Sequence, residues 1–137
     1  MRNETQHLQY ISTTGRRLDI TQITTRVTQD FSAMAFDSQG KLYVLDTLNE
    51  RLFTVDPNTG RVFTGVNLNI KLGPGAGMDF NPATGQLLVA DGEVLSPYFG
   101  ARTANIKMYT LNPQTGNLSL VGVLFNASDG LVGLTFR

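Results

Sequence analysis

An acidic, an amide and a basic side chain recur together along this chain. They form two sets in the same order: Asp46, Asn49 and Arg51, then Asp91, Asn105 and Lys107. A carboxylate beside a carboxamide and a cation could contact a polar ligand, or it could hold the backbone of a turn through local hydrogen bonds. Because a set that recurs in each repeat usually serves the repeat itself, the sequence favours a structural network in which the carboxylate holds the turn and the basic residue.

Three carboxylates in or near predicted loops could approach one another and bind a cation: Asp91, Glu93 and Asp129. Calcium needs several converging oxygen ligands, and scattered carboxylates usually remain solvated, so we predict no metal site and keep calcium as the alternative. The chain has no cysteine and a single histidine, His7, which disfavours zinc by its usual ligand sets. The same shortage argues against a Ser-His-Asp triad, and we predict no catalytic residue.

The strongest binding candidates are Tyr98, Phe99 and Arg102, which lie in an insert within residues 92–104. Asp91 and Asn105 are fourteen positions apart where Asp46 and Asn49 are three apart, so eleven residues are inserted. Aromatic and arginine side chains on an exposed loop are enriched at binding hot spots. Alternatively, the two rings fold back and cap the neighbouring strands. The candidate binding residues are thus Tyr98, Phe99, Arg102, Glu93, Asp91 and Asp129.

A repeat positions these residues. The segment from Phe31 to Gly65 matches the segment from Gly75 to Gly122, including Asp-Pro-Asn-Thr-Gly at 56–60 and Asn-Pro-Gln-Thr-Gly at 112–116. A period of about 45 residues that contains four short strands is typical of a β-propeller blade. The turn sequences predict hairpin tips, because Asp or Asn accepts a local backbone bond, Pro presets φ and Gly adopts positive φ.

The pattern predicts an all-β chain that forms part of a β-propeller of four-stranded antiparallel blades. The whole of 1–137 is then one propeller-like domain, with a half-blade at 1–24, a blade at 31–68, a blade at 75–124 with the insert 92–104, and the first strand of another blade at 130–137. The predicted strands are 6–11, 16–24, 32–36, 41–46, 50–55, 61–68, 76–80, 86–91, 105–111, 117–124 and 130–137.

Eleven strands make fewer than three blades, whereas a closed ring needs about four or more. The chain is therefore expected to be a segment of a longer propeller or to self-associate, because an open arc exposes strand edges and apolar faces. The glycine turns are expected on one face of the blades. Any partner should engage the opposite face, which carries the longer loops, because loops on a rigid scaffold commonly carry binding residues.

Composition narrows the class of partner. Eleven basic residues balance eleven acidic ones, so no net field attracts phosphate backbones or anionic lipids, and we predict neither a nucleic acid nor a membrane partner. No apolar run is long enough for a signal peptide or a membrane span, which predicts a soluble chain without an export signal. The absence of cysteine leaves the compartment open.

The run AFDSQGKLYVLDTLNERLFTVD resembles an NHL-type propeller blade, in which an apolar-Asp-x-x-Gly-x-apolar-Tyr-Val-x-Asp run leads to Asp-Thr-x-Asn-x-Arg. The runs GMDFNPATGQLLVAD and MYTLNPQTGNLSLVG resemble repeats of secreted bacterial propellers of unassigned function. Such propellers include binding scaffolds, gluconolactonase-like hydrolases and lyases. The resemblance implies a secreted or periplasmic location if the chain is a segment of a longer protein.

Two functional hypotheses follow from this resemblance. The first is a non-enzymatic binding or scaffold module whose partner is a protein or a small carbohydrate-like ligand. The alternative is a metal-dependent sugar-lactone hydrolase or lyase of the gluconolactonase or NHL kind, with its site completed by blades outside this chain. Lactone turnover that needs calcium or zinc and stops on chelation would favour the enzyme.

Overall fold

The computed structural model describes residues 7–23, 31–63, 65–92 and 104–127. All regular structure within these residues is β-strand, and the strands form three separate antiparallel sheets. The predicted all-β class is confirmed. The described part of the chain contains no helix long and apolar enough to cross a membrane.

Sheet 1 is a hairpin of two strands, β1 (His7–Ile11) and β2 (Arg17–Gln22). The two strands agree with those predicted at 6–11 and 16–24. The turn between them closes through the Gly15 N–H, which donates to the Ser12 carbonyl at 2.9 Å, and Gly15 has a φ of 84°. A residue in this left-handed region is most easily glycine, which explains why the hairpin turns there.

Sheet 2 has four strands in sequence order: β3 (Phe31–Phe36), β4 (Leu42–Asp46), β5 (Arg51–Val55) and β6 (Val66–Asn67). The fourth strand was predicted over 61–68, and this length is wrong. Only an isolated bridge between Val55 and Val62 precedes β6. Gly65 passes so close to β5 that a Cβ there would lie under 3.0 Å from the Leu52 carbonyl oxygen, which is an approach that does not fit a regular ladder.

Sheet 3 also has four strands in sequence order: β7 (Gly77–Phe80), β8 (Leu87–Gly92), β9 (Ala104–Leu111) and β10 (Leu118–Ala127). These strands agree with the predictions for 76–124. The predicted strand at 130–137 lies outside the described residues. The five predicted turn glycines, at positions 15, 40, 60, 85 and 116, all have positive φ, between 71° and 84°, which confirms the turn chemistry.

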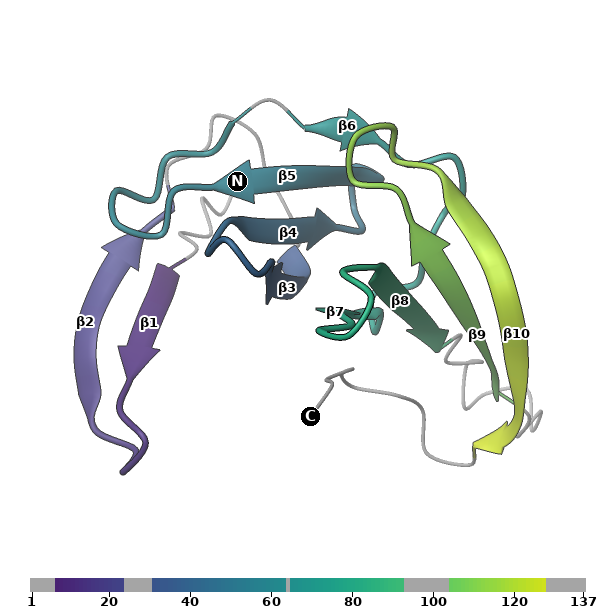
Figure 1. Ribbon diagram of the computed structural model, residues 1–137, viewed down its shortest axis with the longest axis horizontal. Coiled ribbons are helices and arrows are strands. Elements are labelled where there is room, and N and C mark those ends of the chain that lie inside the picture. Colours follow the sequence, from purple (N-terminus) through teal and green to yellow (C-terminus); the bar gives the residue numbers. More distant parts are fainter. Residues whose placement is uncertain (1–6, 24–30, 64, 93–103, 128–137) are drawn as a thin grey trace.

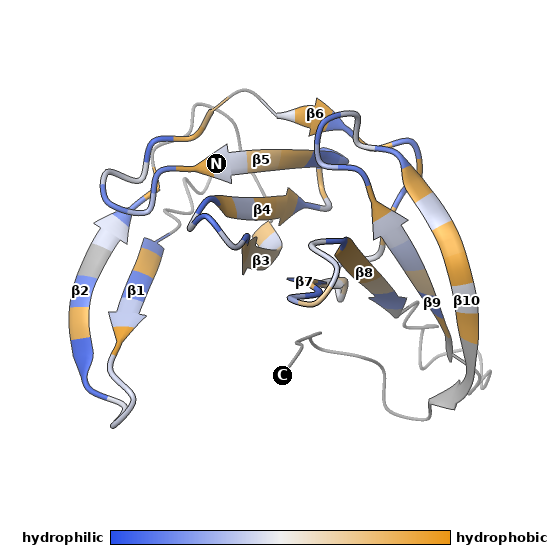
Figure 2. Cartoon of the chain, viewed as in Figure 1, coloured by the Kyte–Doolittle hydropathy of each residue, from blue (hydrophilic) through white to orange (hydrophobic). Residues whose placement is uncertain are grey.

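The sheets follow one another around an open arc (Figure 1). The first strands of sheets 2 and 3, β3 and β7, lie toward the inside of the arc and contact each other, while β2, β6 and β10 lie on its outer rim. Every residue of β4 is buried, and the strand is strongly hydrophobic (Figure 2). A strand that is apolar on both faces is expected where sheets cover it on each side.

Alternation along β4 divides the core into two clusters. Leu42 and Val44 face sheet 1, where they pack with Leu8, Ile23 and Val55. This contact between sheets 1 and 2 is called the first junction. Tyr43 and Leu45 point the other way, into a larger cluster shared by sheets 2 and 3, which is called the second junction.

Candidate functional site

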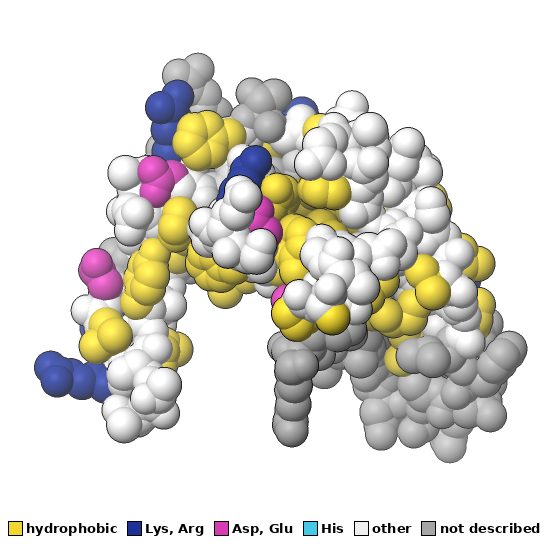
Figure 3. Space-filling model, in the orientation of Figure 1, with side chains coloured by type: hydrophobic (Ala, Val, Ile, Leu, Met, Phe, Trp, Pro, Cys, Tyr) yellow, Lys and Arg dark blue, Asp and Glu magenta, His cyan; other side chains and the backbone are white. Residues whose placement is uncertain are grey.

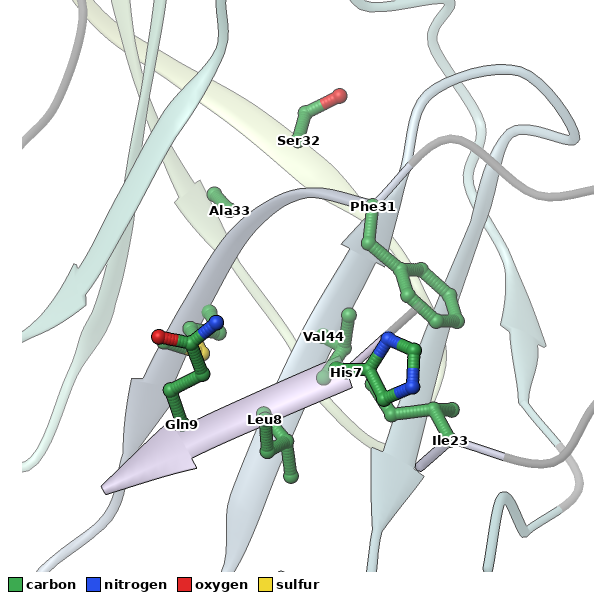
Figure 4. A pocket seen from close by; sticks show the side chains of 9 residues that line it. His7, Leu8, Gln9, Ile23, Phe31, Ser32, Ala33 and Val44 are labelled. Carbon is green, nitrogen blue, oxygen red and sulfur yellow. The ribbon is translucent and has the colours of Figure 1, made fainter. Parts of the chain in front are cut away.

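A pocket of about 310 Å³ lies at the first junction (Figure 4). Strand β1 and the residue after β2 line one side, and the start of β3 with one residue of β4 lines the other. The lining residues are His7, Leu8, Gln9, Ile23, Phe31, Ser32, Ala33, Met34 and Val44. In Figure 4, His7, Phe31 and Ile23 lie toward one end of this pocket and Gln9 toward the other.

The pocket follows the edge of β1. His7, Leu8 and Gln9 are consecutive, and consecutive side chains of a strand point to opposite faces, so all three can line one space only along the strand's edge. Strands β5 and β9 correspond to β1 in the repeat, and each pairs with a strand on both edges. Among the described strands, β1 pairs only with β2. Its second edge therefore faces the pocket with no described strand beside it.

The lining of the pocket is almost uncharged. It contains no Asp, Glu, Lys or Arg, and its only titratable side chain is His7. Met34 is 57% exposed, which leaves an apolar side chain open to solvent at the pocket. Ser32 does not contribute a free hydroxyl, because it hydrogen-bonds to the hydroxyl of Thr47, the residue after β4. The space suits an uncharged, mainly apolar group.

A second pocket, of about 460 Å³, lies on sheet 3 between its two hairpin turns. Its lining is mostly amides and hydroxyls: Gln86, Thr110, Asn112, Gln114, Asn117 and Ser119 all border it. The Asn112 oxygen is already used, since it accepts the backbone N–H groups of Gln114 and Thr115. Part of this polar lining therefore holds the turn.

The carboxylate of Asp46 organises the turn between β4 and β5. It is fully buried. Its Oδ1 accepts the backbone N–H groups of Leu48 and Asn49, both at 3.1 Å, and its Oδ2 accepts the Asn49 side-chain amide at 2.7 Å. Glu50 completes the turn with a φ of 54°, which non-glycine residues seldom adopt. These contacts fasten the chain locally, as an Asx turn does.

Arg51 pairs with Asp46 across the strands, and its Nη2 donates to the Gly65 carbonyl at 3.1 Å. Its guanidinium also lies over the Phe53 ring, 5.2 Å from the centroid. Within the described part of the chain, the buried Nε has no hydrogen-bond partner. Arg51 thus connects β5 to the chain that precedes β6.

Asp91 occupies the corresponding place in sheet 3 but makes a different contact. Its Oδ1 accepts the backbone N–H of Gly73 at 2.9 Å, from the segment that connects sheets 2 and 3. Lys107 is its cross-strand partner. Asn105 is placed on β9. The same residue type therefore fastens a turn in one sheet and an inter-sheet connection in the next.

Of the predicted binding residues, only Asp91 lies within the described part of the chain. Tyr98, Phe99, Arg102, Glu93 and Asp129 lie outside the described residues, so their role stays a prediction. Within the described ranges, no three His, Asp or Glu side chains gather in a way that could hold a metal ion.

The pocket beside β1 was not predicted from the sequence. The residue pattern carries no signal for it, because the pocket joins residues 7–9 to residues 31–34, which only the fold brings together. Comparisons of the chain with protein-family models, with curated proteins and with solved structures found no match.

Proposed function

We propose that this protein is a non-enzymatic binding module of β-propeller type. Successive four-stranded antiparallel sheets, sequential strand order, and contact between the inner strands β3 and β7 support the propeller form. The observation that carries the binding function is the pocket that runs along the second edge of β1, where no described strand is paired. The partner is a protein segment in extended conformation that adds to this edge.

Strand addition combines two kinds of contact. The backbone of the incoming segment bonds to the edge of β1, which supplies affinity whatever the side chains are. The apolar lining accepts alternate side chains, which supplies selectivity. Leu8, Phe31 and Val44 are the apolar residues of the pocket that come from three different strands. A segment with alternating apolar residues toward the pocket fits this surface.

The repeat itself suggests a probe. In sheet 2, β4 is the strand that pairs with β5, and β5 corresponds to β1. A capped synthetic peptide of residues 41–47, KLYVLDT, is therefore the natural candidate to pair with β1. Titrated into the isotopically labelled full chain, it should slow amide exchange at residues 7–11 in a saturable way. Exchange at β5 and β9, which are paired on both edges, should stay unchanged.

The matched control is the same peptide with alternate backbone nitrogens methylated along the edge that would face β1. It keeps every side chain but cannot donate the ladder hydrogen bonds, so it should not protect β1. Equal binding by both peptides, or no protection of β1 by either, would overturn the proposal. Calcium-dependent turnover of a sugar lactone by the purified chain would replace it with the enzyme hypothesis.

A further inference from the structure

We infer that a second copy of this chain docks head to tail, with its Gly15 turn against the outer edge of β10 at Val123. This inference goes beyond the proposed function, because it uses the outer end surfaces of the arc and not the pocket beside β1. It rests on a backbone contact that the structure repeats at both of its junctions.

At each junction, a turn glycine of one sheet lies against the last strand of the preceding sheet. A Cβ at Gly60 would lie under 3.0 Å from the carbonyl oxygen of Gln22, which ends β2. A Cβ at Gly116 would lie equally close to the carbonyl oxygen of Asn67, which ends β6. Any residue other than glycine would push the sheets apart, so the contact depends on the missing side chain.

The residue that receives the glycine lies at a fixed distance along the sequence from the turn glycine of its own sheet. Gln22 lies seven positions after the turn glycine Gly15, and Asn67 lies seven positions after Gly60. The position seven after Gly116 is Val123, on β10. The register supports this equivalence, because Asn67 pairs with Arg51 as Val123 pairs with Lys107. Val123 is therefore the receiving position of sheet 3.

Both halves of a third such contact are open. Gly15 has the φ of the other turn glycines, yet no described atom lies within 4 Å of where its Cβ would be. At the other end, β10 pairs with β9 alone among the described strands. Among the described residues, the Gly15 turn thus meets no receiving strand, and β10 meets no glycine turn. One copy can therefore place its Gly15 turn against β10 of another copy, which repeats the contact found at each junction.

The end surfaces are also apolar enough to associate. Ile11 and Leu18 of sheet 1 are 62% and 63% exposed, and Val121 of sheet 3 is 62% exposed. In Figure 3, hydrophobic side chains run along the limb that β1 and β2 form. The formal net charge of zero adds no overall repulsion between copies. Because the two surfaces differ, the contact is heterologous and builds a ring or an open filament.

Gly15→Asn tests the contact in the full chain. Asparagine tolerates positive φ better than other side chains, so the isolated hairpin should keep its turn, while the new Cβ blocks the close approach. Gly40→Asn is the matched control, since Gly40 has a φ of 80° and equally open surroundings but is not at the position that meets a preceding sheet. Sedimentation equilibrium of the wild type should show a mass that rises with concentration. Gly15→Asn should raise the dissociation constant at least tenfold, and Gly40→Asn should leave it unchanged.

Cross-linking sets the direction of docking. The chain has no cysteine, so Thr14→Cys and Val123→Cys variants each carry one thiol. Under mild oxidation, a mixture of the two should give mainly the mixed disulfide. Three outcomes would each overturn the inference. The first is a wild type that stays monomeric at every accessible concentration, and the second is equal weakening of association by both asparagine variants. The third is that most disulfides join two copies of the Thr14→Cys variant. Repeating the peptide titration on Gly15→Asn tests the pocket beside β1 separately, because that variant leaves the β1 edge intact.

Discussion

The two junctions of this protein share one backbone contact but differ in how much they bury. Among the described residues, five buried apolar residues fill the first junction and thirteen fill the second, so hydrophobic stabilisation is concentrated between sheets 2 and 3. The glycine approach is common to both, with Gly60 on Gln22 and Gly116 on Asn67. The contact therefore fixes how one sheet sits on the next, while apolar burial decides how firmly it is held.

The difference has a structural origin. At the second junction, the inner strand β7 contacts β3, and the connecting segment adds Leu68, Leu72 and Ala76 to the core. At the first junction, the pocket lies beside β1, where sheets 2 and 3 have a further strand. The pocket thus lies at the junction with the smaller buried core.

Removing a large side chain from each face of β4 should give the largest effect. Leu45 is 0% exposed and points into the second junction, whereas Leu42, at 1%, points into the first. Leu45→Ala should lower the free energy of unfolding by about 4 kcal/mol, because the surrounding core cannot collapse onto the cavity. Leu42→Ala should cost about 2 kcal/mol, the lower end for such changes, because its smaller cluster has fewer contacts to lose.

Urea unfolding followed by far-UV circular dichroism measures both variants, and the two leucines control for each other because they share a strand. Equal losses would mean that the first junction is as tightly packed as the second. The larger buried core of the second junction would then not make that junction more stable than the first.

Gly116→Ala tests the shared backbone contact and should have the next largest effect. Alanine there adds strain at a φ of 79° and drives a Cβ into the Asn67 carbonyl, so we expect a loss of about 3 kcal/mol from strain and overpacking together. Gly85→Ala is the control, because Gly85 has a φ of 71° and open space around it. It should cost only about 1 kcal/mol.

Thermal unfolding of the two alanine variants separates strain from the clash. If both lose the same stability, the close approach of sheets 2 and 3 contributes nothing, and glycine is needed at 116 for its φ alone.

Asn69→Ala should have a moderate effect, confined to the second junction. The Asn69 side chain accepts the Leu118 N–H at 2.8 Å and donates to the Leu118 carbonyl at 3.4 Å. It therefore bonds to both backbone groups of Leu118, as a residue of a neighbouring strand would. Its loss should cost about 1 to 2 kcal/mol, since two backbone groups lose their partner. Tyr10→Phe is the counterpart at the first junction, where the hydroxyl donates to the Pro57 carbonyl at 2.6 Å, and should cost about 1 kcal/mol. Amide exchange of Leu118 should rise in the first variant only.

The local features of the fold could be predicted from the sequence. The turns were predictable because Asp or Asn, Pro and Gly determine the backbone within five residues, and the positive φ at Gly60 and Gly116 is as predicted. Strand positions followed from the repeat. The short β6 did not, because the pairing with β5 shifts by one residue between the Val55–Val62 bridge and the Leu52–Val66 pair, a change that no local pattern encodes.

The candidate site was harder to predict for the same reason. Asp46 and Asp91 look equivalent in sequence, yet Asp46 accepts bonds from its own turn, and Asp91 accepts one from Gly73, eighteen residues away. The pocket beside β1 joins residues 7–9 to residues 31–34, and its existence depends on which strands are side by side. The volume and lining of the pocket therefore required the structure.

The smallest expected effect is a pH dependence that is present at the first junction and absent at the second. The turn that meets sheet 1 begins with Asp56, whereas the equivalent turn that meets sheet 2 begins with the uncharged Asn112. The backbone N–H of Asn58, then the backbone and side chain of Thr59 and the charge of Arg61, hold the pKa of Asp56 below its ordinary value, against a smaller opposing effect of burial. Because the pKa of Asp56 is lower in the folded than in the unfolded state, its carboxylate stabilises the fold at pH values above the ordinary pKa of aspartate. This stabilisation is lost as the pH falls from the ordinary pKa to the lowered one. Because Asp56 is solvent-accessible, the effect should be slight.

The amide chemical shifts of Asn58 should therefore titrate in acid while those of Gln114 stay constant, and Asp56→Asn should abolish the difference. Parallel acid titration at both turns would show that the two junctions respond together.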